Sequence, residues 1–235
     1  MTEETSADRF HPFWGYMIRI GMNIGADRPI AAKPSHLEWK VTRGDPQMIE
    51  CLQEGGTRDY LRCDRDYWHE LVEEMAEAGI NAALIDVMEG VQYESHPELA
   101  VKGSWTPEQL HESLDHMRSL GIEPIPKLNF STCHDSWMGE YSRMVSTRPY
   151  YQVCADLIKE VGEWFDRPRF FHIGMDEENA RMQERNHLVM YRQGDLWWHD
   201  LEWFAEEVRK QDMRPMMWSD MWWEREEEFC QRCPK

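Results

Sequence analysis

The stretch RFFHIGMDEE, residues 169–178, runs from an apolar segment directly into three consecutive acids. An apolar run of this length between polar flanks is typical of a strand buried in a parallel sheet. Placing paired carboxylates directly after such a strand is costly unless they meet a partner, a ligand or water. The stretch therefore predicts a strand over 169–175 whose end carries functional acids, Asp176 and Glu177.

The same alternation of apolar strand and amphipathic helix extends in both directions from this stretch. Four more strands are expected at 15–24, 80–87, 122–130 and 213–218. Between them, apolar residues recur every three to four positions, which predicts helices at about 66–78, 106–121, 150–165 and 196–211. The second helix has clear end signals, because Thr106 and Gln109 have capping-box spacing and Gly121 suits the C-terminal end.

Strand–helix–strand repetition predicts parallel strands joined by right-handed crossovers, the pattern of an α/β fold. A closed (β/α)8 TIM barrel needs eight strands, and about five β/α units can be counted here. We therefore expect residues 1–235 to form a single, partial TIM-barrel-like catalytic domain, with an open doubly wound sheet as the alternative. Long irregular stretches at 26–63 and 178–195 are expected to pass over one face of the sheet.

The composition limits the partners and the compartment. With 44 acidic and 26 basic residues, the formal net charge is −18. Such a surface repels phosphate backbones and anionic lipid, so we expect neither a nucleic-acid nor a membrane partner. The first ten residues, MTEETSADRF, show no secretory pattern, which predicts a cytoplasmic protein with six reduced cysteines.

Polar residues with chemical potential follow the expected strands at the edge where active sites of such folds lie. They are Asp86 and Glu89, Asn129 and His134, Asp176 and Glu177, and Trp218 and Asp220. Hydrolysis of an acetal needs one acid that protonates the leaving oxygen and one negative charge that supports the cationic centre. Two neighbouring carboxylates can divide these roles, since the charge of one opposes ionisation of the other.

Adjacent strand residues point to opposite faces, so Asp176 and Glu177 can reach one sugar only if the backbone turns after Met175. The competing interpretation is that an Asp-Glu pair in an acidic protein simply forms a solvated loop or a helix start.

These residues resemble the β-N-acetylhexosaminidases of glycoside hydrolase family 20. FFHIGMDE, residues 170–177, is similar to that family's His-hydrophobic-Gly-Gly-Asp-Glu strand, with Met175 at the second glycine. His134 stands where the family has the histidine of a Pro-Gly-His turn. Matching stretches in the same order are SHPEL (95–99), WTPEQL (105–110), LGIEPIP (120–126), the helix over 150–164 and WSD (218–220).

The resemblance implies retaining hydrolysis in which the substrate's own 2-acetamido group is the nucleophile, with no cofactor and no bound metal. Glu177 would be the general acid/base, and Asp176 would orient and stabilise the acetamido group. Glu89 and His134 would belong to the polar network behind that pair, and Asp220 with Trp218 would contact the sugar. With Arg19 and Asp86, these four residues complete the predicted substrate-binding set.

Several positions depart from the family pattern. Trp14-Gly15-Tyr16 replaces the expected Arg-Gly of the first strand, and Arg19 is shifted relative to that arginine. Lys127 and Asn129 stand where the family has acids, and Asp86 stands where it has a histidine. A divergent specificity follows from these changes.

Two other functions compete. The carboxylates and His134 include enough hard ligands for Mn²⁺ or Mg²⁺, which would suit a metal-dependent barrel enzyme. The altered binding positions would suit a non-catalytic carbohydrate-binding relative. An open five-strand piece would also expose strand edges, which predicts self-association.

Overall fold

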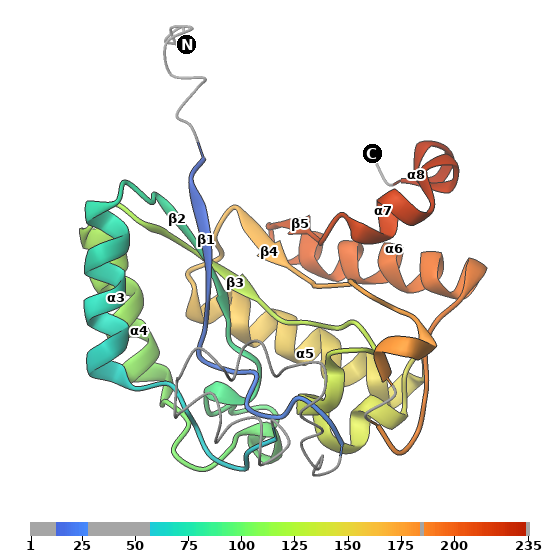
Figure 1. The fold of residues 1–235 in the computed structure, drawn as a ribbon, viewed down its shortest axis with the longest axis horizontal. Helices are drawn as coiled ribbons and strands as arrows, with labels where there is room; N and C mark the ends of the chain where they lie inside the picture. The colour runs from blue at the N-terminus through green and yellow to red at the C-terminus, as the bar shows by residue number, and fades with distance from the viewer. Residues whose placement is uncertain (1–12, 28–56, 184–185, 234–235) are drawn as a thin grey trace, which may run out of the picture.

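A computed structural model of the chain describes residues 13–27, 57–183 and 186–233, so most of the predicted irregular stretch 26–63 lies outside it. These residues form one sheet of five parallel strands in the order β1-β2-β3-β4-β5 (Figure 1). The strands are β1 (Gly15–Arg19), β2 (Ala82–Asp86), β3 (Glu123–Lys127), β4 (Phe170–His172) and β5 (Arg214–Met216).

Helices occupy the connections between strands, as the apolar spacing predicted. The longer ones are α3 (Arg65–Glu77), α4 (Pro107–Ser119), α5 (Arg148–Trp164) and α6 (Gly194–Lys210). Two short helices, α7 (Asp220–Glu224) and α8 (Glu226–Arg232), follow β5. Short 3₁₀ segments lie at η3 (Met88–Gly90), η4 (Pro97–Leu99), η5 (Asp135–Arg143) and η6 (Ala180–Gln183). None of the helices in the described ranges is long and apolar enough to cross a bilayer.

The strand order separates the two expected architectures. Each strand lies beside the one that precedes it in sequence, as consecutive barrel strands do. In a doubly wound sheet, by contrast, the order in which strands are added reverses at a switch point, while the strands stay parallel. The described residues therefore form an open α/β sheet wound in one direction, with the topology of a barrel segment.

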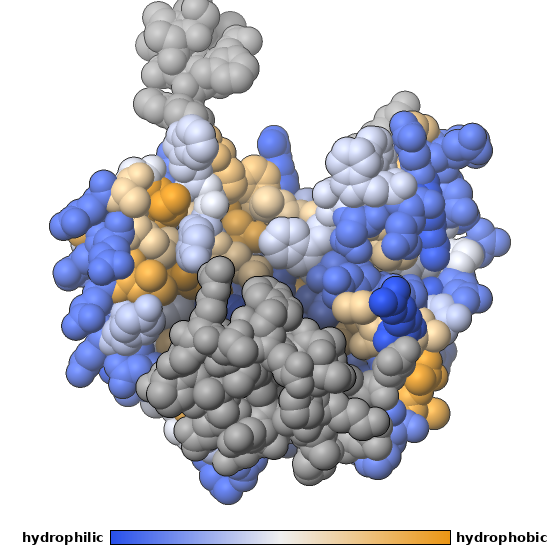
Figure 2. All heavy atoms as spheres, in the orientation of Figure 1, coloured by the Kyte–Doolittle hydropathy of each residue, from blue (hydrophilic) through white to orange (hydrophobic). Residues whose placement is uncertain are grey.

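The two faces of this sheet are packed differently. The main core lies between the sheet and the helices and includes Ile85, Leu114, Leu157 and Phe204, all fully buried. The opposite face carries a small cluster made of Ala82, Leu84 and Ile125 with the partly buried Met17, Phe170, Met216 and Trp218. In Figure 2, apolar side chains gather over the strands between the hydrophilic surfaces of the flanking helices.

Local end signals predicted α4 well. The Thr106 hydroxyl accepts from the Gln109 N–H at 3.3 Å, and the Gln109 side chain accepts from the Thr106 N–H at 3.0 Å. Gly121, just after the helix, adopts a φ of 79°, which suits glycine. The predicted capping box and helix end are confirmed.

All five strands are shorter than predicted, and β1 and β4 illustrate the difference. β1 ends at Arg19 rather than at residue 24, and β4 covers Phe170–His172 rather than 169–175. The second correction has a backbone cause, because Gly174 and Met175 have φ values of 77° and 64°, which no strand can accommodate.

Two prolines weaken the junction between β3 and β4. The N–H of Glu123 donates to the residue that precedes β2, so the alternate positions Pro124 and Pro126 face β4. Proline has no N–H to donate. β3 and β4 accordingly share one registered pair, Lys127 with His172, whereas β2 and β3 share five.

Candidate active site

The chain turns sharply where β4 ends. Gly174, Met175 and Glu177 all have positive φ values, of 77°, 64° and 56°. A Cβ on Gly174 would lie 2.0 Å from Oδ1 of Asn129, so only glycine fits this approach to the loop after β3. Met175 stands where the family resemblance expects a second glycine, and its backbone adopts the left-handed conformation that glycine favours.

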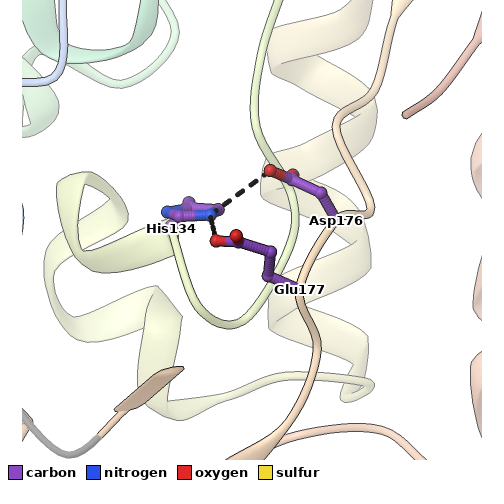
Figure 3. Close-up of side chains that lie close together, drawn as sticks. All are labelled: His134, Asp176 and Glu177. Carbon is purple, nitrogen blue, oxygen red and sulfur yellow. Dashed lines mark hydrogen bonds and ion pairs between the residues drawn. The ribbon is translucent and has the colours of Figure 1, made fainter. Parts of the chain in front are cut away.

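This turn directs two adjacent carboxylates toward one imidazole (Figure 3). Nε2 of His134 lies 3.0 Å from Oε2 of Glu177 and 3.3 Å from Oδ2 of Asp176. The Glu177 side chain is 44% exposed, whereas those of Asp176 and His134 are 17% and 18% exposed. The predicted turn after Met175 is therefore present, and both acids remain accessible from solvent.

Hydrogen-bond donors from the loop after β3 hold Asp176. Nδ2 of Asn129 donates to Oδ1 of Asp176 at 2.9 Å, and the Ser131 hydroxyl donates to the Asp176 carbonyl. Burial alone would raise the pKa of Asp176, but the bonds and charge of His134 and the amide of Asn129 outweigh it, so this pKa is lowered. Asp176 is therefore an anion at neutral pH.

Glu177 is also held through its backbone, while its half-exposed carboxylate contacts His134. Its N–H donates to Oδ2 of Asp220 at 2.8 Å, and the Cys133 thiol donates to its carbonyl. Asp220 is the first residue of α7, directly after the β5 segment. The predicted site residue Asp220 therefore contacts the site, although it does so at the backbone of Glu177.

His134 responds to both acids. Burial lowers the pKa of its imidazole, but the hydrogen bonds and charges of Asp176 and Glu177 outweigh this effect and raise it. A second histidine nearby behaves in the opposite way: burial and the charge of Lys127 lower the pKa of His172 to about 3. His172 is thus neutral, and its Nδ1 accepts the Gly174 N–H at 3.1 Å.

Two of the predicted sugar contacts lie at accessible positions. Trp218 is partly buried, its ring centroid lies 4.6 Å from that of His172, and its backbone N–H donates to the Gly174 carbonyl at 3.1 Å. The Arg19 side chain is 47% exposed, with Nε 3.8 Å from Oδ2 of Asp86.

The other two predicted contacts are buried. Asp86 is fully buried and pairs with Nζ of Lys127 at 2.7 Å, so it offers no exposed oxygen to a ligand as it lies. Burial raises the pKa of Asp86 despite the nearby Lys127. Glu89 is also fully buried, and its carboxylate accepts the backbone N–H groups of Met22, Asn23 and Ile24. The resemblance implies a place for Glu89 in the polar network behind Asp176 and Glu177, but the bonds that its carboxylate makes organise the loop after β1.

Sequence reasoning missed the residues behind the site. Glu178, the third consecutive acid, turns inward and forms a buried ion pair with Arg192. The irregular stretch 178–195 is expected to pass over one face of the sheet, but nothing in its sequence singles out Arg192. Ser131 and Cys133 were likewise missed, because their contacts join loops more than 40 residues apart.

Comparison with known proteins supports the fold of this chain but does not assign its activity. No protein-family model matches the sequence, and no curated protein matches it. Among solved structures, the fold is similar to the family 20 β-N-acetylhexosaminidase of Streptomyces coelicolor A3(2), with 14% identity, a TM-score of 0.57, and coverage of 72% of this chain and 38% of that one.

Two further solved structures have a similar fold. The family 20 exo-β-N-acetylglucosaminidase from Vibrio harveyi, in complex with N-acetylglucosamine, has 14% identity and a TM-score of 0.54 over 68% of this chain and 34% of its own. The chitobiase of Flavobacterium johnsoniae has 19% identity and a TM-score of 0.53 over 66% and 29%. The chain spans about a third of the length of these enzymes, and what it shares with them at these identities is the fold.

Proposed function

We propose that this chain carries the sugar-cleaving site of a glycoside hydrolase that acts like an exo-β-N-acetylhexosaminidase. The observation that carries the proposal is the meeting of Asp176 and Glu177 at Nε2 of His134, at the C-terminal end of β4. Both acids stay accessible, and the end of the sheet on which they lie is where folds of this kind place their chemistry. The three similar structures named above, two family 20 enzymes that remove N-acetylhexosamine or N-acetylglucosamine and a family 20 chitobiase, support the choice of reaction.

In this proposal Glu177 transfers the proton. As the glycosidic bond breaks, Glu177 donates a proton to the leaving oxygen, and it later removes a proton from the water that completes hydrolysis. The carbonyl oxygen of the substrate's 2-acetamido group attacks the anomeric carbon and forms a cyclic cation, which water then opens with net retention. Asp176, ionised because its pKa is lowered, stabilises that positive charge.

The surrounding residues have supporting roles. His134 donates toward both carboxylates and fixes their orientation. Trp218, Arg19 and Asp220 contact the sugar. Asp86 acts from behind through Arg19, and Glu89 acts through the loop after β1.

Substituting the acid/base tests the proposal. Glu177→Gln keeps the shape and removes the transferable proton, so hydrolysis of an N-acetyl-β-glucosaminide with a poor leaving group should fall on the order of a hundredfold or more. Glu112→Gln, at a side chain on α4 that is 70% exposed, is the matched control and should keep the wild-type rate. An unchanged rate in Glu177→Gln would rule out the assignment.

The nucleophile can be tested separately from the acid. Replacing the acetamido group of the substrate by trifluoroacetamido makes its carbonyl oxygen a weaker nucleophile. If that oxygen attacks the anomeric carbon, the wild-type rate falls sharply with fluorination. A rate that does not depend on fluorination would point to a nucleophile supplied by the protein or by water.

One observation favours a second candidate function. Ligand atoms of His134, Asp176 and Glu177 lie within 4.8 Å of one another, a spacing that would suit a divalent cation in a metal-dependent enzyme. Calorimetric titration with Mn²⁺ and Mg²⁺, and activity before and after chelation, separate this candidate from the glycosidase. Binding of N-acetylglucosamine without any hydrolysis would instead indicate a carbohydrate-binding relative.

A further inference from the structure

The two halves of the proposed active site come from neighbouring strands with few backbone bonds between them. Asp176 and Glu177 follow β4, whereas His134 lies in the loop after β3. Because Pro124 and Pro126 remove two donors from β3, the strand ladder contributes little here. Backbone bonds continue only as far as Phe130, whose N–H donates to the Ile173 carbonyl at 3.1 Å. Beyond that point, side-chain contacts set how far apart the two halves of the site lie.

Glu178 crosses this junction directly behind the exposed carboxylates. Its side chain is fully buried, and both carboxylate oxygens receive hydrogen bonds from the guanidinium of Arg192. The backbone N–H of Thr132, in the loop after β3, donates to Oε1 of Glu178 at 3.1 Å. Glu178 thus joins the segment after β4 to the loop that ends at His134.

Arg192 binds three elements at once. Its Nη2 donates to the carbonyl of Phe130, after β3, at 2.6 Å, and its Nη1 donates to Oδ2 of Asp200, in α6, at 3.1 Å. With the side chain only 1% exposed, these bonds form without competition from water. The planar, forked guanidinium suits such a set of fixed contacts, which an ammonium group could not reproduce.

The backbone beside Glu178 is one that needs support. Glu177 has a φ of 56°, which is disfavoured for a residue with a Cβ and persists only where the surroundings fix it. We propose that Arg192 is a positioning residue. Through Glu178 and the Phe130 carbonyl, it holds the segment 176–178 against the loop after β3, and so sets the contacts of His134 with both carboxylates.

The kinetic consequence of this inference rests on the proposed function, whereas its geometric consequence does not. The test is the double variant Glu178→Leu/Arg192→Met, since replacing both partners of a buried pair with apolar side chains preserves folding better than removing one. Asp200, the other acid that Arg192 contacts, keeps the hydrogen bonds that the hydroxyls of Ser146 and Tyr151 donate to it. We expect a folded protein in which kcat falls on the order of a hundredfold with KM little changed, because the reacting groups are misplaced. The ring NMR signals of His134 should move, and their titration should shift toward the ordinary value of 6.5.

Two further variants control the experiment. Leu114→Ala removes a fully buried side chain from α4 and reports how kcat responds to lost stability alone. Arg192→Lys keeps the charge without the fork, and it carries the test if the double variant does not fold. Unchanged kcat and unchanged His134 signals, in a folded double variant or in Arg192→Lys, would overturn the inference. If the wild-type protein hydrolyses no β-N-acetylhexosaminide, the proposed function fails and the His134 signals alone decide the inference.

Discussion

Three consecutive acids of this protein lie in two contrasting environments. Asp176 and Glu177 are accessible and share an imidazole, whereas Glu178 is fully buried and binds a guanidinium. The chemical groups are nearly identical, so the backbone turn that directs each side chain decides its role. Carboxylates open to solvent can meet a substrate, while a carboxylate closed off with a fixed cation can only hold structure in place.

The largest expected effect on stability comes from neutralising the buried acid, and neutralising an accessible acid provides the comparison. Glu178→Gln leaves Arg192 buried with one fewer anionic partner, so we expect a loss of roughly 3 to 5 kcal/mol in the free energy of unfolding. Glu177→Gln alters an accessible group and should cost less than about 1 kcal/mol. Urea denaturation of both variants measures the difference, and equal losses would remove the distinction between the two environments.

The turn that separates these acids can be broken at its glycine. In Gly174→Ala, the new Cβ meets Asn129 at 2.0 Å and the φ of 77° is unfavourable, so we expect a loss of roughly 2 to 4 kcal/mol. Gly79 is a matched control, because its φ is 82° but no atom lies within 4 Å of an added Cβ. Gly79→Ala should therefore cost only the backbone part, about 1 kcal/mol. Thermal denaturation that ranks Gly79→Ala as the worse variant would contradict this account.

A smaller effect is expected at the next residue of the turn. Since Met175 has a φ of 64°, Met175→Gly should be more stable than Met175→Ala by about 1 kcal/mol, although both lose the same buried side chain. The order should reverse at Met117, a buried position within α4, where alanine is favoured over glycine by about 1 kcal/mol. Unfolding free energies of the four variants provide the comparison, and the same order at both sites would argue against backbone strain at Met175.

The smallest expected effect on stability comes from the attraction between His134 and the two accessible acids, Asp176 and Glu177. The raised pKa of His134 means that its protonated form stabilises the fold, fully below the ordinary value of 6.5 and decreasingly as pH rises through the folded value. The lowered pKa of Asp176 means that its contribution is present above 3.8 and is lost as pH falls through the folded value. His134→Gln should therefore destabilise most between these limits, by less than about 1 kcal/mol. Denaturation midpoints at pH 5.5 and 8.5 test this, and a larger cost at the higher pH would reverse the expected sign.

The parts of this molecule that sequence predicts best depend on signals a few residues apart. Thr106 and Gln109 predict the start of α4, and the spacing of apolar residues along each helix predicts which face is buried. The parallel direction of the strands followed from their alternation with helices, because a crossover helix constrains the next strand to be parallel. The order of the strands did not follow from it, and the structure was needed to choose between a barrel segment and a doubly wound sheet. Closeness of Asp176, Glu177 and His134 was implied by the family resemblance, and the structure brings the three together.

The residues that sequence could not place owe their positions to distant partners. Glu89 accepts hydrogen bonds from residues 65 to 67 positions earlier, and Arg192 bonds a carbonyl 62 positions earlier. A buried charged residue has the same local pattern as an exposed one, since burial is decided by what packs over it. Asp86 shows the same limit, because only the fold reveals that Lys127 faces it from the next strand.

The prolines of β3 have a consequence for how the molecule comes apart. With Pro124 and Pro126 withholding donors, the sheet has its weakest line between β3 and β4. Local opening in proteins follows such lines and divides a domain into cooperative units. On this basis, we expect β1–β3 with α3 and α4 to behave as one folding unit, and β4 and β5 with α6 as another. Native-state hydrogen exchange should give each unit its own opening free energy, with the proposed active site lying across their boundary.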